Sequence, residues 1–186
     1  ENLADHLTHF YLFFMPDFTG EAYAGRPWIA EAQRRFAAQA GEQARRALAA
    51  RQRWFTLMGT LGGKWPHTAS IDPGGSARAV DAAERLRLLA RLREFRGFVE
   101  AELFGAPLAE VNALASPSDL TAWRAEAPGR GDLRAFLDIA DDLALPQLGR
   151  GPGRYLSHGS FEDAGDDGTG AALFPPGTWA EGQAEP

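Results

Sequence analysis

Cysteine is missing from all 186 residues of this sequence, and histidine occurs only four times. Without cysteine, these residues can form no disulfide, no thiolate metal site and no cysteine nucleophile. The same absence leaves the redox compartment undetermined.

Long hydrophobic runs are also missing, and no apolar stretch approaches the ~20 residues needed to cross a bilayer. The first segment is apolar but carries Asp5, His6 and His9, which argues against a signal peptide. The 25 acidic and 19 basic residues give a formal charge of −6, which argues against a general nucleic-acid or anionic-membrane surface. We therefore expect no membrane span and no nucleic acid partner.

Apolar residues recur at three- and four-residue spacing up to about residue 145, which is typical of helices. The predicted helices cover residues 2–14, 34–61, 79–104, 107–114 and 132–143, with a further helix start at 116–119. After Pro146, glycine, proline and alternating residues predict loops and short strands, with an acidic turn at 163–170. The predicted fold is mainly α. A long antiparallel helical bundle forms the core over residues 1–145, and a loop- and short-strand-rich part, a minor α+β part, follows over residues 146–186.

The first candidate site is the series Asp5-His6-x-x-His9 on the first helix. It places two imidazoles on adjacent helical faces beside a carboxylate, a spacing that can bind a metal or relay protons. Two nitrogens do not make a closed zinc site. The alternative is that these polar groups form hydrogen bonds within a buried helix interface.

The second candidate is the loop Gly62-Gly63-Lys64-Trp65-Pro66-His67, followed by Pro73-Gly74-Gly75. A phosphate-binding loop would need glycine at position 58 and Ser or Thr at position 65, where this sequence has Met58 and Trp65. A nucleotide loop is therefore rejected. Lys64 and His67 are either presented for binding from a stiff turn or belong to a helix end, where lysine complements the helix dipole and glycines cap the last turn.

Two further stretches receive structural interpretations. The turn Gly149–Arg154 lacks the strand-to-helix context of a dinucleotide fingerprint. The arginines of residues 85–96 alternate with glutamates, so a solvated or interface face is favoured over a polyanion site.

Several motifs taken in order resemble the middle of the large subunit of nickel-iron hydrogenases. They are Asp5-His6-Leu7-Thr8-His9-Phe10-Tyr11, Gly62–His67, Pro73-Gly74-Gly75 and Gly149–Ser157. The resemblance extends over nearly all of the chain. The continuation Tyr11–Phe18 looks closer to the regulatory, H2-sensing branch than to membrane-bound uptake enzymes.

The resemblance implies a nickel-iron centre whose four cysteine ligands lie outside this chain, so we expect residues 1–186 to be a central fragment of a single large-subunit domain, inactive in isolation. Asp5 resembles the family's acidic residue in the canopy above the open metal position, where it can orient a base for heterolytic H2 cleavage. His6, His9, Lys64 and His67 match motif positions near the cofactor or the small-subunit interface.

The expected partners are a small subunit that carries iron–sulfur clusters and, in the sensing branch, a sensor histidine kinase. The expected location is cytoplasmic, or membrane-associated through a partner if the parent protein is an uptake enzyme. Two alternatives remain open from the sequence: a cofactor-free paralogue acting as a maturation factor or scaffold, and an unrelated helical interaction domain.

Overall fold

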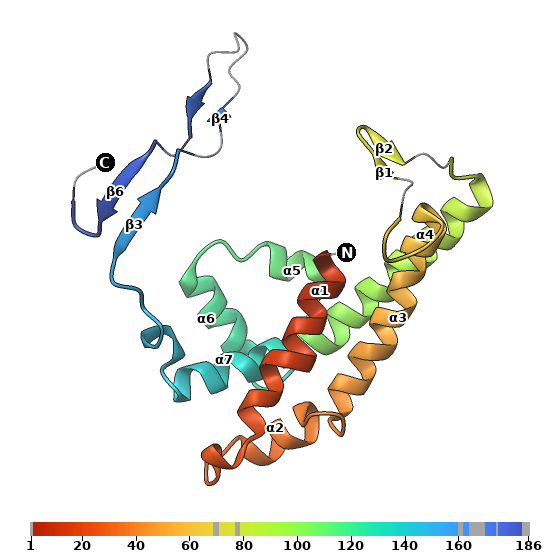
Figure 1. Cartoon of the computed structure of the whole chain (residues 1–186). Helices are drawn as coiled ribbons and strands as arrows, with labels where there is room; N and C mark the ends of the chain where they lie inside the picture. The colour runs from red at the N-terminus through yellow and green to blue at the C-terminus, as the bar shows by residue number, and fades with distance from the viewer. Residues whose placement is uncertain are drawn as a thin grey trace. The chain divides into compact units, whose positions relative to one another are not determined.

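A computed structural model describes residues 2–68, 71–76, 79–159, 162–163, 170–173 and 175–183. The chain divides into two compact units, Glu1–Ile139 and Ala140–Pro186. Helices dominate the described residues and the strands are short, which confirms the mainly α fold predicted from the sequence (Figure 1). None of the helices in this described part of the chain is long and apolar enough to cross a membrane.

The first helical stretch contains three geometries in succession. α1 (Asn2–Thr8) continues into the π-helix η1 (His9–Phe14) and then into the 3-10 helix η2 (Met15–Thr19). The helix predicted for residues 2–14 is therefore confirmed. The buried residues of the whole stretch from α1 to η2 are Ala4, Leu7, Tyr11, Met15 and Phe18. Leu3 and Phe13 lie outside this face and are 57% and 66% exposed, so the first helix is buried on one side only.

The single helix predicted for residues 34–61 is wrong at its start. The short 3-10 helix η3 (Glu21–Tyr23) is followed by α2 (Ile29–Phe36). Five residues then separate α2 from a distinct helix, α3 (Glu42–Gly62). The chain reverses sharply between them, because the Gly41 N–H donates to the Ala37 carbonyl oxygen at 2.7 Å. A Cβ on Gly41 would lie 2.5 Å from the Arg35 carbonyl oxygen, so only glycine fits this reversal.

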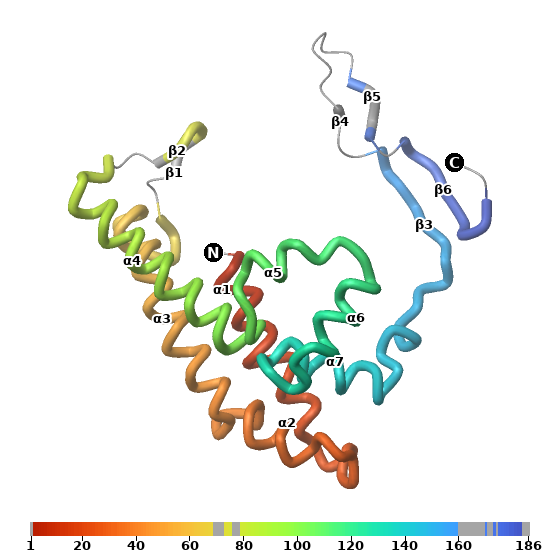
Figure 2. Tube along the Cα trace, turned by 180° about the vertical axis from the view of Figure 1, so that it is seen from behind, coloured from red at the N-terminus to blue at the C-terminus, as the bar shows by residue number. Residues whose placement is uncertain are grey.

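A two-stranded hairpin, β1 (Ile71–Asp72) and β2 (Gly75–Ser76), lies between α3 and the next long helix. That helix, α4 (Ala82–Phe98), continues as the π-helix η4 (Val99–Phe104). It starts three residues later than predicted, because the Asp81 side chain accepts a hydrogen bond from the Glu84 N–H and forms a capping box. α3 and α4 run antiparallel and side by side (Figures 1 and 2), as predicted.

The apolar stripe of α4 is only partly covered. Phe95 is buried and stacks on Trp54 of α3, with ring centroids 4.3 Å apart. In contrast, Leu86 is 68% exposed and Leu92 is 46% exposed. The periodicity identified the apolar face correctly, but burial is concentrated toward its C-terminal end, where Phe95 is buried and Val99 and Leu103 are half-buried.

Three shorter helices complete the helical unit, and all three were predicted. They are α5 (Leu108–Asn112), α6 (Pro117–Glu126) and α7 (Asp132–Asp142). α6 begins as its sequence indicates, because the Ser116 hydroxyl accepts a hydrogen bond from the Asp119 N–H at 3.2 Å.

The second unit contains the short strands predicted after Pro146. After the 3-10 helix η5 (Leu145–Gln147), β3 (Arg154–Ser157) pairs antiparallel with β6 (Gly177–Ala180). β4 (Glu162–Asp163) pairs in the same sense with β5 (Ala171–Ala172). Most of the acidic turn predicted at 163–170 lies outside the described residues.

Candidate functional site

Asp5, His6 and His9 lie on the exposed side of α1 and at the start of η1. Among the described residues, none forms a hydrogen bond or ion pair with the Asp5 carboxylate. The His9 ring stacks on Phe14, with centroids 5.9 Å apart. The alternative of a buried, hydrogen-bonded interface therefore does not hold for these three residues. They are available to groups outside the helical unit.

Lys64 and His67 are exposed on the loop that follows α3. Gly62 ends the helix, and its carbonyl oxygen accepts a hydrogen bond from the Thr68 hydroxyl at 2.8 Å. Gly63 follows with a φ of 73°, so the two glycines do terminate the helix as the simpler interpretation predicts. No hydrogen bond, ion pair or ring contact between described residues joins this loop to Asp5, His6 or His9.

A metal centre made from the described residues alone is not present. Within the ranges that the structure describes, no group of three His, Cys, Asp or Glu side chains could hold a metal ion. The residues of the Asp5-His6-x-x-His9 series can therefore act beside a metal but cannot hold one by themselves.

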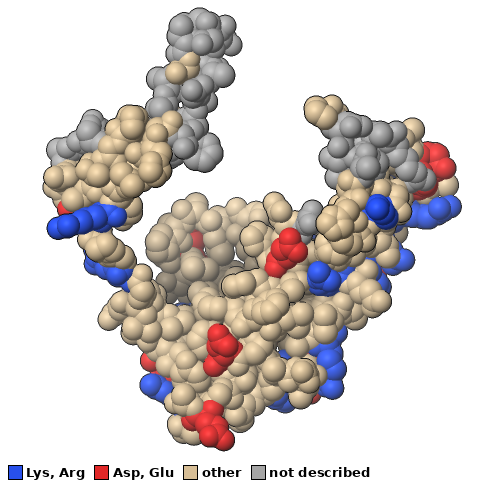
Figure 3. All heavy atoms as spheres, in the orientation of Figure 1, with Lys and Arg blue, Asp and Glu red and all other residues tan. Residues whose placement is uncertain are grey.

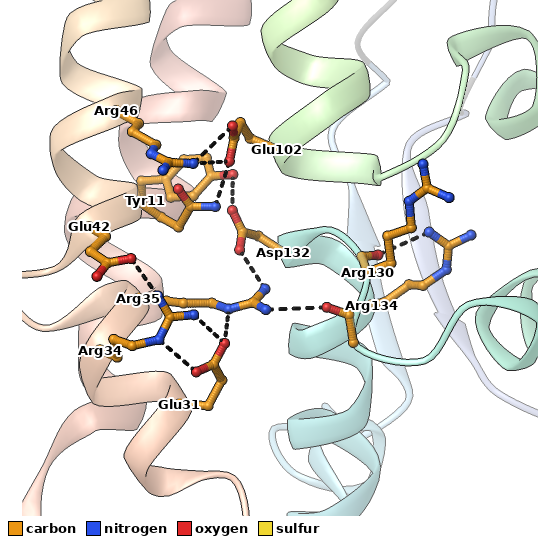
Figure 4. Close-up of polar contacts among 12 residues, drawn as sticks. Tyr11, Glu31, Arg34, Arg35, Glu42, Arg46, Glu102, Arg130, Asp132 and Arg134 are labelled. Atoms are coloured by element: carbon orange, nitrogen blue, oxygen red, sulfur yellow. Dashed lines mark hydrogen bonds and ion pairs between the residues drawn. The ribbon is translucent and has the colours of Figure 1, made fainter.

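The helix that carries Asp5 is anchored by a buried polar network that the sequence analysis missed. The Tyr11 hydroxyl donates to Asp132 Oδ2 at 2.7 Å, and Arg35 Nη1 donates to Asp132 Oδ1 at 3.1 Å. Tyr11 and Asp132 are both 0% exposed. Figure 4 shows Tyr11 and Arg35 pointing toward Asp132 from two different elements. η1, α2 and the start of α7 are thus joined at one carboxylate.

The network continues toward the surface through α3 and η4. Gln43 Nε2 donates to Glu102 Oε2 at 2.8 Å, and Arg46 Nη1 donates to both Glu102 oxygens at 2.9 and 3.0 Å. On the α2 side, Glu31 accepts hydrogen bonds from Arg34 and Arg35. A polar cleft of about 280 Å³ lies among these groups. Every formal charge in the network faces one of opposite sign.

Burial sets the protonation of this network. Desolvation raises the pKa of the Asp132 carboxyl, while the hydrogen bond from Tyr11 and the charge of Arg35 act in the opposite direction. Desolvation also raises the pKa of Tyr11, and the Asp132 charge adds to that effect. Tyr11 therefore remains a hydrogen-bond donor, and its hydroxyl favours the ionised carboxylate.

An apolar groove of about 610 Å³ lies next to the Asp5–His9 face. Its lining comes from α1, η1, α3, α4, η4, α5 and α7. The lining residues are Leu3, His6, Leu7, Phe10, Trp54, Leu92, Phe95, Arg96, Val99, Leu103, Phe104, Leu108 and Leu133. His6 and Arg96 are the polar members. A concave apolar surface with few polar groups is typical of a binding site.

Comparison with known proteins assigns no family. No protein-family model matches the chain, and no curated protein matches it.

Sequence reasoning found Tyr11 only as part of a motif, and it missed Asp132, Arg35 and the groove. Tyr11 and Asp132 are 121 residues apart, so no local spacing could pair them. Two features of the sequence could have indicated the pair: Tyr11 lies on the buried side of an apolar helix, and Asp132 is the first residue of α7. The long apolar stripe of α4 was a partial indication of the groove, because the stripe is longer than the surface that α3 alone can cover.

Proposed function

We propose that this chain is the central part of a nickel-iron hydrogenase large subunit, in which H2 is cleaved heterolytically or sensed. The observation that carries the proposal is the ordered series of motifs from Asp5 to Ser157, whose order and spacing both match that family. The nickel-iron centre, held by cysteines outside this chain, would supply the site at which H2 binds and splits.

The exposed carboxylate of Asp5 supports the role that the resemblance implies. A side chain that orients a base, or receives its hydrogen bond, must be free of competing ion pairs, and no described residue forms one with Asp5. The buried Tyr11–Asp132 hydrogen bond anchors η1, which continues α1, so Asp5 is presented from an anchored helical stretch. Such preorganisation is what acid–base catalysis requires of the protein.

His6, His9, Lys64 and His67 are given supporting roles in this proposal. Their side chains are exposed on two separate segments. Exposed imidazoles and an ammonium suit contacts with other parts of the subunit or with a small subunit carrying iron–sulfur clusters. In a sensing complex the signal would pass to a histidine kinase.

The first experiment reads the coding sequence on both sides of this segment and measures nickel and iron in the matured heterodimer. Two cysteine pairs and both metals are expected. If the complete reading frame lacks the cysteines, the cofactor-free maturation factor or scaffold becomes the better explanation.

The second experiment tests Asp5 in the intact complex. Asp5→Asn keeps the shape of the side chain and removes its charge, so H2 oxidation and H/D exchange should fall at least about tenfold with nickel and iron content unchanged. Asp17→Asn is the matched control, because Asp17 is another exposed aspartate of the same helical stretch. Full activity of Asp5→Asn would remove Asp5 from the site.

A further inference from the structure

The side of α4 that lines the apolar groove also carries arginines. Arg85, Leu89, Leu92 and Arg96 follow one another at intervals of four, three and four residues, which places them on one side of α4. Leu92 and Arg96 line the groove. The groove face of α4 therefore has leucines in the middle and an arginine toward each end.

The basic charge on this helix is not fully neutralised within the chain. Arg96 Nε is 2.8 Å from Glu100 Oε1. Arg85 and Arg93 are exposed, and neither forms an ion pair with any described residue. Figure 3 shows basic side chains along the side of the helical unit on which α3 and α4 run. A partner of opposite charge would find the unpaired guanidinium groups of Arg85 and Arg93 on the helix that lines the groove.

Large apolar side chains at the rim of the groove remain in contact with water. Leu3 is 57% exposed and Leu92 is 46% exposed. Contiguous exposed apolar surface with a polar rim marks interaction sites on soluble proteins. Covering a leucine side chain contributes about 1.5–3 kcal/mol when the burial is complete.

We propose that this groove binds an acidic amphipathic helix of a partner protein. The apolar side of that helix enters the groove against Leu3, Trp54 and Leu92, and its acidic residues face Arg85 and Arg96. This is the helix-in-groove mode of recognition, in which apolar anchors supply affinity and flanking charges supply orientation and specificity. The inference goes beyond the proposed function and does not depend on a metal centre.

The length of the surface favours a helix over a small apolar molecule. Arg85 and Arg96 are eleven residues apart, which corresponds to about 16 Å along α4. A partner helix of three turns has the same length and can place acidic residues near both ends. A fatty acid carries one carboxylate and could reach only one of these arginines.

The test uses the 186-residue chain and two fluorescein-labelled helical peptides. Both carry leucines at positions i, i+3, i+4 and i+7, and they differ only in glutamate or lysine at the flanking positions. We expect the glutamate peptide to bind at least about tenfold more tightly than the lysine peptide in fluorescence anisotropy, with a preference that shrinks as salt is added. Equal affinity of the two peptides, or no binding of either, overturns the proposal.

Two leucines of matched exposure locate the binding surface. Leu92→Asp places a charge at the groove and should weaken binding of the glutamate peptide at least about tenfold. Leu48→Asp is the control, because Leu48 is a leucine of α3, is 47% exposed and lies outside the groove lining. It should change the affinity less than about twofold, and circular dichroism should show both variants folded. Equal effects of the two variants would refute the assigned surface.

A charge reversal tests the role of α4. Arg85→Glu should weaken binding of the glutamate peptide and strengthen binding of the lysine peptide. An unchanged preference overturns the proposed orientation. Binding of dodecanoate without binding of either peptide would identify a small-molecule site instead. Self-association that Leu92→Asp abolishes in sedimentation would identify an interface between copies of this chain, and either outcome rejects the partner helix.

Discussion

Replacing Tyr11 by phenylalanine tests whether the buried carboxylate of Asp132 anchors the first helix. The change removes one hydroxyl and keeps the ring, which contacts Phe36 and Phe98. Because the hydroxyl donates at 2.7 Å to a carboxylate with no solvent exposure, its loss leaves a buried, charged oxygen without that donor. Such a loss costs about 1.5–3 kcal/mol, so the folded-to-unfolded ratio should fall by roughly a factor of 45 at the middle of this range.

Urea unfolding followed by circular dichroism measures this free energy. Tyr23→Phe is the control, because Tyr23 also lies in a ring cluster, with Phe18 and Trp28, but its hydroxyl forms no hydrogen bond with a described residue. The control should change the free energy of unfolding by less than about 0.5 kcal/mol. If Tyr11→Phe is equally mild, the Tyr11–Asp132 contact is not an anchor.

The pH dependence of the same variant gives an independent check. The Tyr11 hydrogen bond favours the ionised form of Asp132, whose pKa burial raises. The loss of stability in Tyr11→Phe should therefore be largest where Asp132 is ionised, and should shrink as the pH falls through its raised pKa. A difference in unfolding free energy that is constant from neutral to acidic pH contradicts this origin.

Three further predictions concern other contacts. Arg134 is buried, its guanidinium carbon lies 3.5 Å from the centre of the Trp123 ring, and it donates hydrogen bonds to three backbone carbonyl oxygens. Arg134→Lys should therefore lower the free energy of unfolding, measured by urea unfolding, by about 2–4 kcal/mol. A change below about 0.5 kcal/mol would contradict this prediction. Ser116→Ala removes the cap of α6 and should cost about 1 kcal/mol in the same assay. Hydrogen bonding from Arg34 lowers the pKa of Glu31 to about 2, so its stabilising contribution is present above its ordinary pKa near 4.5 and is lost as the pH falls toward 2. Glu31→Gln should therefore lose less stability over that interval than the unmodified chain, and equal losses would refute the assignment.

Local patterns predicted most of the helices because their signals lie within a few residues. The hydroxyl of Ser116 marked the start of α6, and the change of composition at Pro146 marked the change from α-helices to short strands. The break between α2 and α3 was missed because alanines surround it. Alanine is the strongest helix former, whereas the reversal depends on the close backbone approach at Gly41.

The buried network could not be predicted, for a different reason. Asp132 is one of 25 acidic residues, and nothing adjacent to it indicates burial. Its environment is assembled by Tyr11, Arg35 and the Gly129 carbonyl oxygen, which itself accepts a hydrogen bond from Arg35. Three segments far apart in the sequence must fold before this carboxylate has partners.

The orientation of the first helix connects the network to the candidate site. Apolar residues occur on both sides of this helix, since Leu3 and Phe13 are exposed while Leu7 is buried. Apolar burial alone would therefore tolerate a rotation by one residue, which is about 100° and would turn Asp5 toward a different neighbour. The Tyr11–Asp132 hydrogen bond satisfies buried polar groups in one rotation only. We infer that this buried pair determines which way Asp5 points and which side of the helix, with Leu3, His6 and Leu7, lines the apolar groove. Tyr11→Phe should accordingly reduce the difference between the Leu92→Asp and Leu48→Asp variants in peptide binding. An undiminished difference would mean that packing alone sets the rotation.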